Sequence, residues 1–135
     1  RYLHPQPRHA LADALQRHAS AAMDVSDGLV GDLSKLLEAS GVGAEIDLGE
    51  VPLSGAARAA LMAVPALAEL AWTGGDDYEI LCTASEREYP ALITAAEGTM
   101  LSLVPIGRIS DEAGVVTYRE KGEARRFAQG SFSHF

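Results

Sequence analysis

The chain has 135 residues, of which 47% are hydrophobic and 22% charged, so we expect residues 1–135 to form a single folded domain rather than a disordered segment. The 19 acidic and 11 basic side chains give a net charge of −8, which opposes electrostatic binding to nucleic acid or to an anionic membrane. No apolar run approaches the roughly 20 residues that cross a bilayer. A single cysteine, Cys82, excludes an intrachain disulfide and fits a reducing cytoplasm.

The start of the chain lacks a methionine and contains two prolines, Pro5 and Pro7. We interpret this as trimming from a longer protein whose N-terminal part holds half of the function; a processed chain is the alternative. The prolines predict an extended entry, and apolar residues four positions apart then predict a helix over 11–18.

The rest of the chain alternates between helical and strand-like patterns. Leucines at helical spacing predict a helix from Leu29 that ends at Gly41, where a left-handed cap is wanted. The other predicted elements are strands over 21–25, 42–48, 78–83, 101–109 and 115–118, and helices over 55–62, 65–72 and 86–97. The mixed-charge residues 120–126 are interpreted as a solvated loop. This order predicts an α/β (α+β) fold in which helices flank a mixed β-sheet.

The first candidate site is the DVSDGL segment, residues 24–29. Asp24 and Ser26 are two residues apart at the end of a predicted strand, so their side chains point to one face. Asp27 begins the turn into the helix. Two crowded carboxylates call for a proton or a cation, and oxygen ligands suit Mg²⁺. Gly28 lets a ligand approach the backbone, and the helix N-terminus offers N–H groups to a phosphate. The alternative is that Ser26 or Asp27 caps the helix at Leu29, and spacing alone favours this cap slightly.

The second candidate site is the GGDDYE segment, residues 74–79, which directly precedes an apolar run. The glycines predict a sharp loop, in which Asp76 and Asp77 bind a cation or accept hydrogen bonds from loop amides. Glu79 falls inside a predicted strand, where an unpartnered carboxylate is costly if buried. A solvated turn is the alternative. Both segments lie at strand ends, where open α/β sheets collect ligands.

Taken together, these motifs resemble the C-terminal domain of thiamine-monophosphate kinases, in the superfamily of aminoimidazole ribonucleotide synthetase. The resemblance rests on the motifs MDVSDGL (23–29), DL (32–33), EASGVGA (38–44), IDL (46–48), VPLS (51–54), GGDDYEIL (74–81) and FSHF (132–135). They follow the family's order over nearly the whole chain. The combination is specific, although either acidic motif alone would be weak.

The resemblance implies transfer of the γ-phosphate of ATP to thiamine monophosphate, with Mg²⁺ neutralising the phosphates. Asp24 and Asp27 would hold magnesium, and Ser26 would contact the phosphates. The thiamine phosphate pocket would be shaped by Gly75, Asp76, Asp77 and Glu79 and closed by Phe132 and Phe135. The family's N-terminal half, with further magnesium-binding aspartates, nucleotide contacts and the barrel of a homodimer, is not in this sequence. The isolated domain would therefore be inactive.

Two other functions stay open at this point. The chain could be a binding or assembly domain that kept the fold without catalysis, or a superfamily member acting on another phosphorylated small molecule. The presence of Asp24, Ser26 and Asp27 argues against the first of these, since a lost site is free to drift to apolar or bulky residues.

Overall fold

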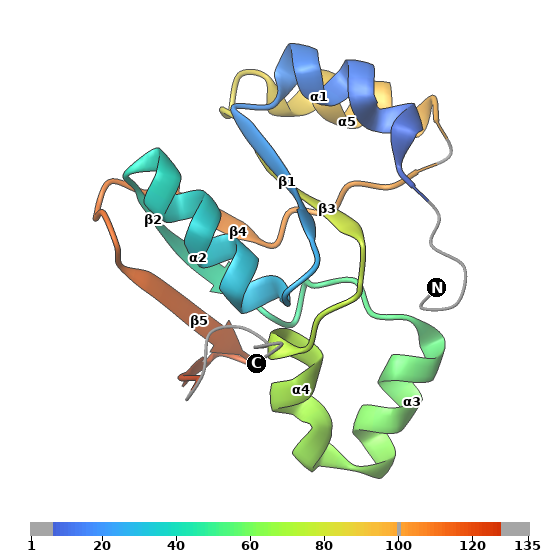
Figure 1. Cartoon of the computed structure of the whole chain (residues 1–135), viewed down its shortest axis with the longest axis vertical. Coiled ribbons are helices and arrows are strands. Elements are labelled where there is room, and N and C mark those ends of the chain that lie inside the picture. Colours follow the sequence, from blue (N-terminus) through green and yellow to red (C-terminus); the bar gives the residue numbers. More distant parts are fainter. Residues whose placement is uncertain (1–6, 100, 128–135) are drawn as a thin grey trace.

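A computed structural model describes residues 7–99 and 101–127 of the chain (Figure 1). The helices are α1 (Ala12–His18), α2 (Leu29–Ser40), α3 (Gly55–Ala63), α4 (Ala68–Thr73) and α5 (Tyr89–Glu97), with 3-10 turns at His9–Leu11 and Pro65–Leu67. The strands are β1 (Ala21–Val25), β2 (Gly43–Asp47), β3 (Glu79–Thr83), β4 (Gly107–Ser110), β5 (Val116–Glu120) and β6 (Glu123–Arg125). Up to β5, the order of these elements is the order predicted from the sequence.

The strands of the described part of the chain divide between two sheets. β1 and β3 form an antiparallel pair, whereas the other strands lie in the order β4-β2-β5-β6. Within that sheet β2 is parallel to β5 and antiparallel to β4, and β5 is antiparallel to β6. The four-stranded sheet is therefore mixed, and the predicted α/β class with flanking helices is confirmed. The separation into two sheets was not predicted, because the pattern within one strand does not specify its neighbour.

Two predicted elements differ from the structure. Helix α5 begins three residues later than the predicted range 86–97, with Pro90 in its first turn, where the missing N–H of proline is tolerated. The strand predicted over 101–109 forms only at its end, in β4, and residues 101–106 have no strand structure. Pro105 cannot donate to a sheet ladder, which disfavours pairing there.

The prediction of a solvated loop over 120–126 was also wrong, because β6 pairs with β5 in a tight hairpin. The turn is formed by Lys121 and Gly122, which have φ angles of 54° and 83°. Positive φ at both central residues is typical of the two-residue turns that match strand twist. A lysine in the first position hid this turn from the sequence pattern.

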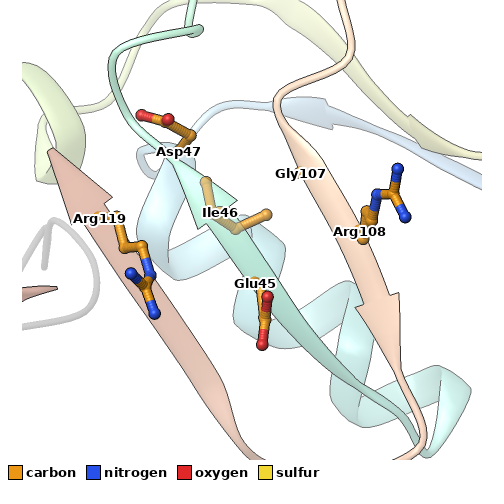
Figure 2. Close-up of a pocket in the computed structure, with 6 residues that line it drawn as sticks. All are labelled: Glu45, Ile46, Asp47, Gly107, Arg108 and Arg119. Carbon is orange, nitrogen blue, oxygen red and sulfur yellow. The ribbon is translucent and has the colours of Figure 1, made fainter. Parts of the chain in front are cut away.

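The outer face of the four-stranded sheet is charged (Figure 2). Exposed Glu45 and Asp47 on β2 alternate with buried Ile46, and they lie opposite Arg108 on β4 and Arg119 on β5 in the sheet register. These residues line a pocket of about 140 Å³. Ligand pockets usually measure about 300–1,000 Å³, so this one is too small to hold a nucleotide.

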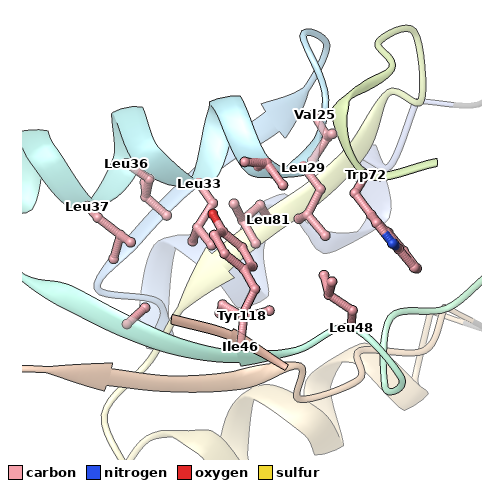
Figure 3. Close-up of a cluster of buried hydrophobic side chains, with 12 residues drawn as sticks. Val25, Leu29, Leu33, Leu36, Leu37, Ile46, Leu48, Trp72, Leu81 and Tyr118 are labelled. Atoms are coloured by element: carbon pink, nitrogen blue, oxygen red, sulfur yellow. The ribbon is translucent and has the colours of Figure 1, made fainter. Parts of the chain in front are cut away.

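The inner face of this sheet packs against α2 and forms the hydrophobic core (Figure 3). Leu33 and Leu37 of α2 are each only 2% exposed, as the helical spacing predicted. The same cluster includes Ile46 of β2, Leu81 of β3 and Tyr118 of β5. Because it contains residues from both sheets, this core fixes the β1–β3 pair relative to the four-stranded sheet.

Both ends of α2 are well defined. At its C-terminal end Gly41 has a φ of 66°, and the amide of Val42 donates to the carbonyl of Leu37 (3.1 Å), which confirms the predicted left-handed cap. At its N-terminal end Leu29 is buried in the same core cluster as Trp72 of α4. The DVSDGL segment is thus anchored on the core where it enters the helix.

The remaining helices lie at opposite ends of the β1–β3 pair (Figure 1). α1 and α5 pack side by side at one end, where Nδ1 of His18 and Oε2 of Glu88 are 2.9 Å apart. α3 and α4 lie towards the other end, and Ser54 caps α3 by accepting the amide of Ala57. Among residues 7–99 and 101–127, no helix combines the length and apolar character needed to cross a membrane.

Candidate functional site

The DVSDGL and GGDDYE segments, far apart in the sequence, lie against each other in the structure. Antiparallel pairing places Val25 of β1 opposite Glu79 of β3. Just beyond the paired strands, the amide of Asp76 donates to the backbone oxygen of Ser26 (2.9 Å), and the amide of Tyr78 donates to that of Val25 (2.8 Å). The two acidic segments that the sequence placed at strand ends therefore form one unit.

Two glycines allow this close contact. Gly28 has a φ of 101°, and a Cβ there would lie 2.7 Å from the backbone carbonyl group of Thr73. A Cβ on Gly75 would lie 2.3 Å from the backbone oxygen of Ser26. Real Cβ atoms do not approach within 3.0 Å of such atoms, so only glycine fits either position. The close neighbour of Gly28 is thus the protein's own backbone. A contact between Gly28 and a ligand stays a prediction.

A buried carboxylate holds the backbone of the DVSDGL segment. Asp32, in the first turn of α2, is 1% exposed. Its Oδ2 accepts the amides of Ser26 and Asp27, both at 2.8 Å, and its Oδ1 accepts Nζ of Lys35 at 2.9 Å. Burial alone raises the pKa of Asp32, but the hydrogen bonds from Lys35 and the two amides outweigh it and hold that pKa below its ordinary value.

This geometry contradicts the helix cap that spacing alone favoured. The N-cap of α2 is Gly28, which has no side chain to accept a capping hydrogen bond. Neither Ser26 nor Asp27 therefore caps the helix. Instead, the side chain of Asp32 reaches back from the first turn of the helix and accepts the amides of Ser26 and Asp27.

Lys35, on the next turn of α2, lies between two carboxylates. Its Nζ is 2.6 Å from Oδ2 of Asp27 and 2.9 Å from Oδ1 of Asp32. These hydrogen bonds, first to Asp27 and then to Asp32, raise the pKa of Lys35 above its ordinary value. Sequence reasoning missed this residue, although its position three residues after Asp32 places both on one face of the helix.

The carboxylates of Asp24 and Asp27 are the predicted magnesium ligands. Asp24 is exposed, Val25 is buried and Ser26, one residue beyond β1, is partly exposed. That Asp24 and Ser26 point to one face stays a prediction. Within residues 7–99 and 101–127, no group of three or more His, Cys, Asp or Glu side chains is arranged to hold a metal ion. Mg²⁺ commonly keeps its waters and uses one or two protein carboxylates with substrate phosphates. The donor set therefore fits part of a magnesium–phosphate site.

The GGDDYE segment has an unusual backbone. Asp76 and Tyr78 have φ angles of 69° and 52°, in the left-handed region that non-glycine residues rarely adopt. The hydroxyl of Tyr78 donates to Oδ1 of Asp76 (2.8 Å), and Asp77 is exposed. Such conformations persist where the surroundings impose them, and they concentrate at functional sites. The substrate contacts assigned to Gly75, Asp76 and Asp77 stay predictions.

Glu79 has a partner that the sequence did not reveal. Arg8, just before the first helix, pairs with both of its oxygens, with Nη2–Oε1 at 2.9 Å and Nε–Oε2 at 3.1 Å. The Arg8 side chain is 12% exposed and that of Glu79 is 41% exposed. This two-point contact removes the cost of a strand carboxylate without a partner. Phe132 and Phe135, predicted to close over the substrate, lie outside the described residues.

Sequence comparison assigns this fold to a family. The profile of the AIR synthase related protein, C-terminal domain, matches residues 4–119. The chain belongs to this family. The predicted resemblance to its superfamily is thereby confirmed.

Within the family, the chain is similar to the C-terminal portion of thiamine-monophosphate kinases. It is 43% identical over 122 residues to the thiamine-monophosphate kinase of Caulobacter vibrioides, which covers 87% of this chain and 34% of that protein. The solved thiamine-monophosphate kinase of Stenotrophomonas maltophilia is 40% identical, with a TM-score of 0.74 over 90% of this chain and 37% of that one. A solved complex of AaThiL with AMPPCP and TMP is 29% identical, with a TM-score of 0.73 over 97% and 38% of the two chains. The chain thus spans well under half the length of these relatives.

Proposed function

We propose that this chain is the C-terminal part of an ATP-dependent kinase that converts thiamine monophosphate to thiamine diphosphate. The observation that carries the proposal is the contact between the DVSDGL and GGDDYE segments, which presents Asp24, Ser26 and Asp27 beside a second acidic loop. The similarity to thiamine-monophosphate kinases, including one solved with AMPPCP and TMP, supports this substrate pair. The catalytic residues on this chain are Asp24, Ser26 and Asp27.

Phosphoryl transfer depends on positioning and on neutralising the charge of the phosphates. Asp24 and Asp27 would hold Mg²⁺, whose charge offsets that of the phosphate oxygens when it is bound. The hydroxyl of Ser26 would donate a hydrogen bond to a phosphate oxygen. Asp32 keeps the backbone under Ser26 and Asp27 in place through its two amide hydrogen bonds. These groups therefore act from a backbone that is ordered before the substrates arrive.

The facing GGDDYE segment would contact thiamine monophosphate on the other side of the transferring phosphate. We assign this contact to Gly75, Asp76, Asp77 and Glu79, with Phe132 and Phe135 closing the pocket. Residues 1–135 would act as one domain beside an N-terminal part that supplies more magnesium ligands, the nucleotide contacts and a homodimer interface. We further propose a cytoplasmic enzyme in which this domain alone is inactive.

The test joins the chain to the N-terminal part of the Caulobacter vibrioides relative and measures ATP consumption and thiamine diphosphate formation with Mg²⁺. The intact relative serves as the positive control. We expect product from the joined protein and a loss of about 100-fold or more in turnover for Asp27→Asn, because a metal-binding charge is removed. Asp13→Asn, at a side chain that is 85% exposed on α1, is the matched control and should retain activity.

Two results would contradict the proposal. Absence of thiamine diphosphate from a joined protein that is folded, while the intact relative makes it, would leave a binding domain or another phosphorylated substrate as the function. Unchanged turnover of Asp27→Asn would show that this carboxylate holds no essential metal ion.

A further inference from the structure

The Asp27 carboxylate already has a cation as its neighbour. Nζ of Lys35 lies 2.6 Å from Oδ2 of Asp27, and it also lies 2.9 Å from Oδ1 of Asp32. The two acceptors differ in exposure, since the Asp27 side chain is 32% exposed and that of Asp32 is 1% exposed. Lys35 itself is 51% exposed. In this three-residue network, Asp32 is therefore fixed in the protein interior, whereas Asp27 faces solvent.

We propose that Lys35 occupies the Asp27 carboxylate as a built-in cation until a divalent metal ion displaces it, and that it thereby sets the metal concentration at which the site fills. The inference rests on the magnesium role proposed for Asp27. A magnesium ion bound to the same oxygen would lie about 2.0–2.1 Å from it. The metal and the ammonium would then be within a few ångströms of each other, where like charges repel.

The geometry gives Lys35 a place to go. Its ammonium is at the end of a flexible four-carbon stem, and it can leave Asp27 while keeping its hydrogen bond to Asp32. Asp32 in turn keeps its bonds to the amides of Ser26 and Asp27. Exchange of the ammonium for a metal ion therefore leaves the backbone of the site unchanged. Lys35 acts through Asp27 and is a positioning residue rather than a catalytic one.

Without a metal ion, the ammonium also offsets the repulsion among nearby carboxylates. Asp24, Asp27 and Asp32 lie within one strand end and one helical turn, in a chain whose net charge is −8. Lys35 reaches two of these carboxylates at once. The DVSDGL segment can thus keep its binding conformation before any ligand is present.

The experiment titrates Mn²⁺, read by electron paramagnetic resonance, into the 135-residue chain, both alone and joined to the N-terminal part of the Caulobacter vibrioides relative. Lys35→Met removes the charge, and Lys35→Gln removes it while keeping a hydrogen-bond donor for Asp32. Each should bind Mn²⁺ about threefold to tenfold more tightly than the parent, because a positive charge a few ångströms from the metal is lost. Lys35→Arg should keep the parent affinity.

Arg87→Met is the matched charge control, because Arg87 is 91% exposed and lies near Glu88, at the opposite end of the β1–β3 pair. It should change the Mn²⁺ affinity by less than about twofold, since salt screens charges beyond about 10 Å. Equal or weaker binding by both uncharged Lys35 variants would overturn the role of Lys35 while leaving the metal role of Asp27 intact. The same tightening in Arg87→Met would show that the effect comes from net charge alone, and it would also overturn the role of Lys35. No Mn²⁺ binding by any variant would contradict the magnesium site itself.

Discussion

Replacement of Asp32 by alanine tests whether one buried carboxylate holds the candidate site together. The change removes the acceptor for the amides of Ser26 and Asp27, both at 2.8 Å, and a partner of Lys35. A buried donor that loses its acceptor costs about 1–3 kcal/mol. Because there are two such amides and the loop can relax partly towards water, we expect a loss of about 2–5 kcal/mol in the free energy of unfolding. Urea unfolding followed by the fluorescence of Trp72 measures it.

Asp32→Asn separates the charge of this group from its shape. One amide oxygen can still accept both loop amides, but the NH₂ group then faces Nζ of Lys35, and two donors repel. Loss of charge-assisted hydrogen bonds predicts a smaller cost, about 1.5–3 kcal/mol at pH 7. Because folding lowers the pKa of Asp32, its charge stabilises the fold above the ordinary value of 3.8, and this stabilisation is lost as the pH falls through the lower folded value. The difference between parent and Asn variant should therefore shrink below about pH 4.

The matched control is Asp13→Asn, at an 85% exposed carboxylate, which should change stability by less than about 0.5 kcal/mol. Amide hydrogen exchange gives a local measurement. The amides of Ser26 and Asp27 should exchange faster in Asp32→Ala, whereas the exchange rates of core amides should change only as much as the global stability changes. A cost for Asp32→Ala within about 0.5 kcal/mol of the control, with unchanged exchange at these two amides, would refute the reasoning.

Three further predictions follow from contacts around the site. Gly75→Ala should destabilise the fold strongly and Gly55→Ala hardly at all, because a Cβ at the first position meets a backbone oxygen at 2.3 Å and at the second meets nothing within 4 Å; equal melting temperatures would contradict this. In a double-mutant cycle on urea unfolding, Arg8→Met and Glu79→Gln should show a coupling energy of about 1 kcal/mol, modest because Glu79 is 41% exposed; additive effects would exclude a stabilising pair. Burial raises the pKa of Cys82, so iodoacetamide should modify it at pH 7.5 more slowly in the folded chain than in urea, and equal rates would show that the thiol is open to solvent.

The features predicted correctly from the sequence are those set by local patterns. The strand over 21–25 and the start of α2 at Leu29 follow from periodicity, and Gly41 marks the end of the helix because only glycine adopts its conformation without strain. Both acidic segments were found by composition and by their place at strand ends. What these patterns could not provide was their contact, since pairing of β1 with β3 depends on distant residues and on register.

The supporting residues of the site escaped prediction for a related reason. Asp32 reads as one more polar residue on α2, and only the structure shows that it is buried with two loop amides as partners. Arg8 lies before the first helix, so nothing in the sequence connects it to Glu79. In each case the role of the side chain depends on the groups that folding brings into contact with it. Sequence motifs thus revealed the two acidic segments, but not the side chains that hold them in place.

That division also explains why the two central variants should fail in different ways. Asp32 fixes the backbone beneath Ser26 and Asp27, whereas the ammonium of Lys35 donates to the carboxylates of Asp27 and Asp32. Loss of Asp32 should therefore loosen the backbone and reduce stability together with any function of the segment. Loss of Lys35 should leave the backbone ordered and change the affinity of the Asp27 carboxylate for cations. If both variants instead gave the same loss of amide protection at Asp27, the backbone and the carboxylate would be held by one indivisible network, and exchange of Lys35 for a metal ion could not occur without disturbing the loop.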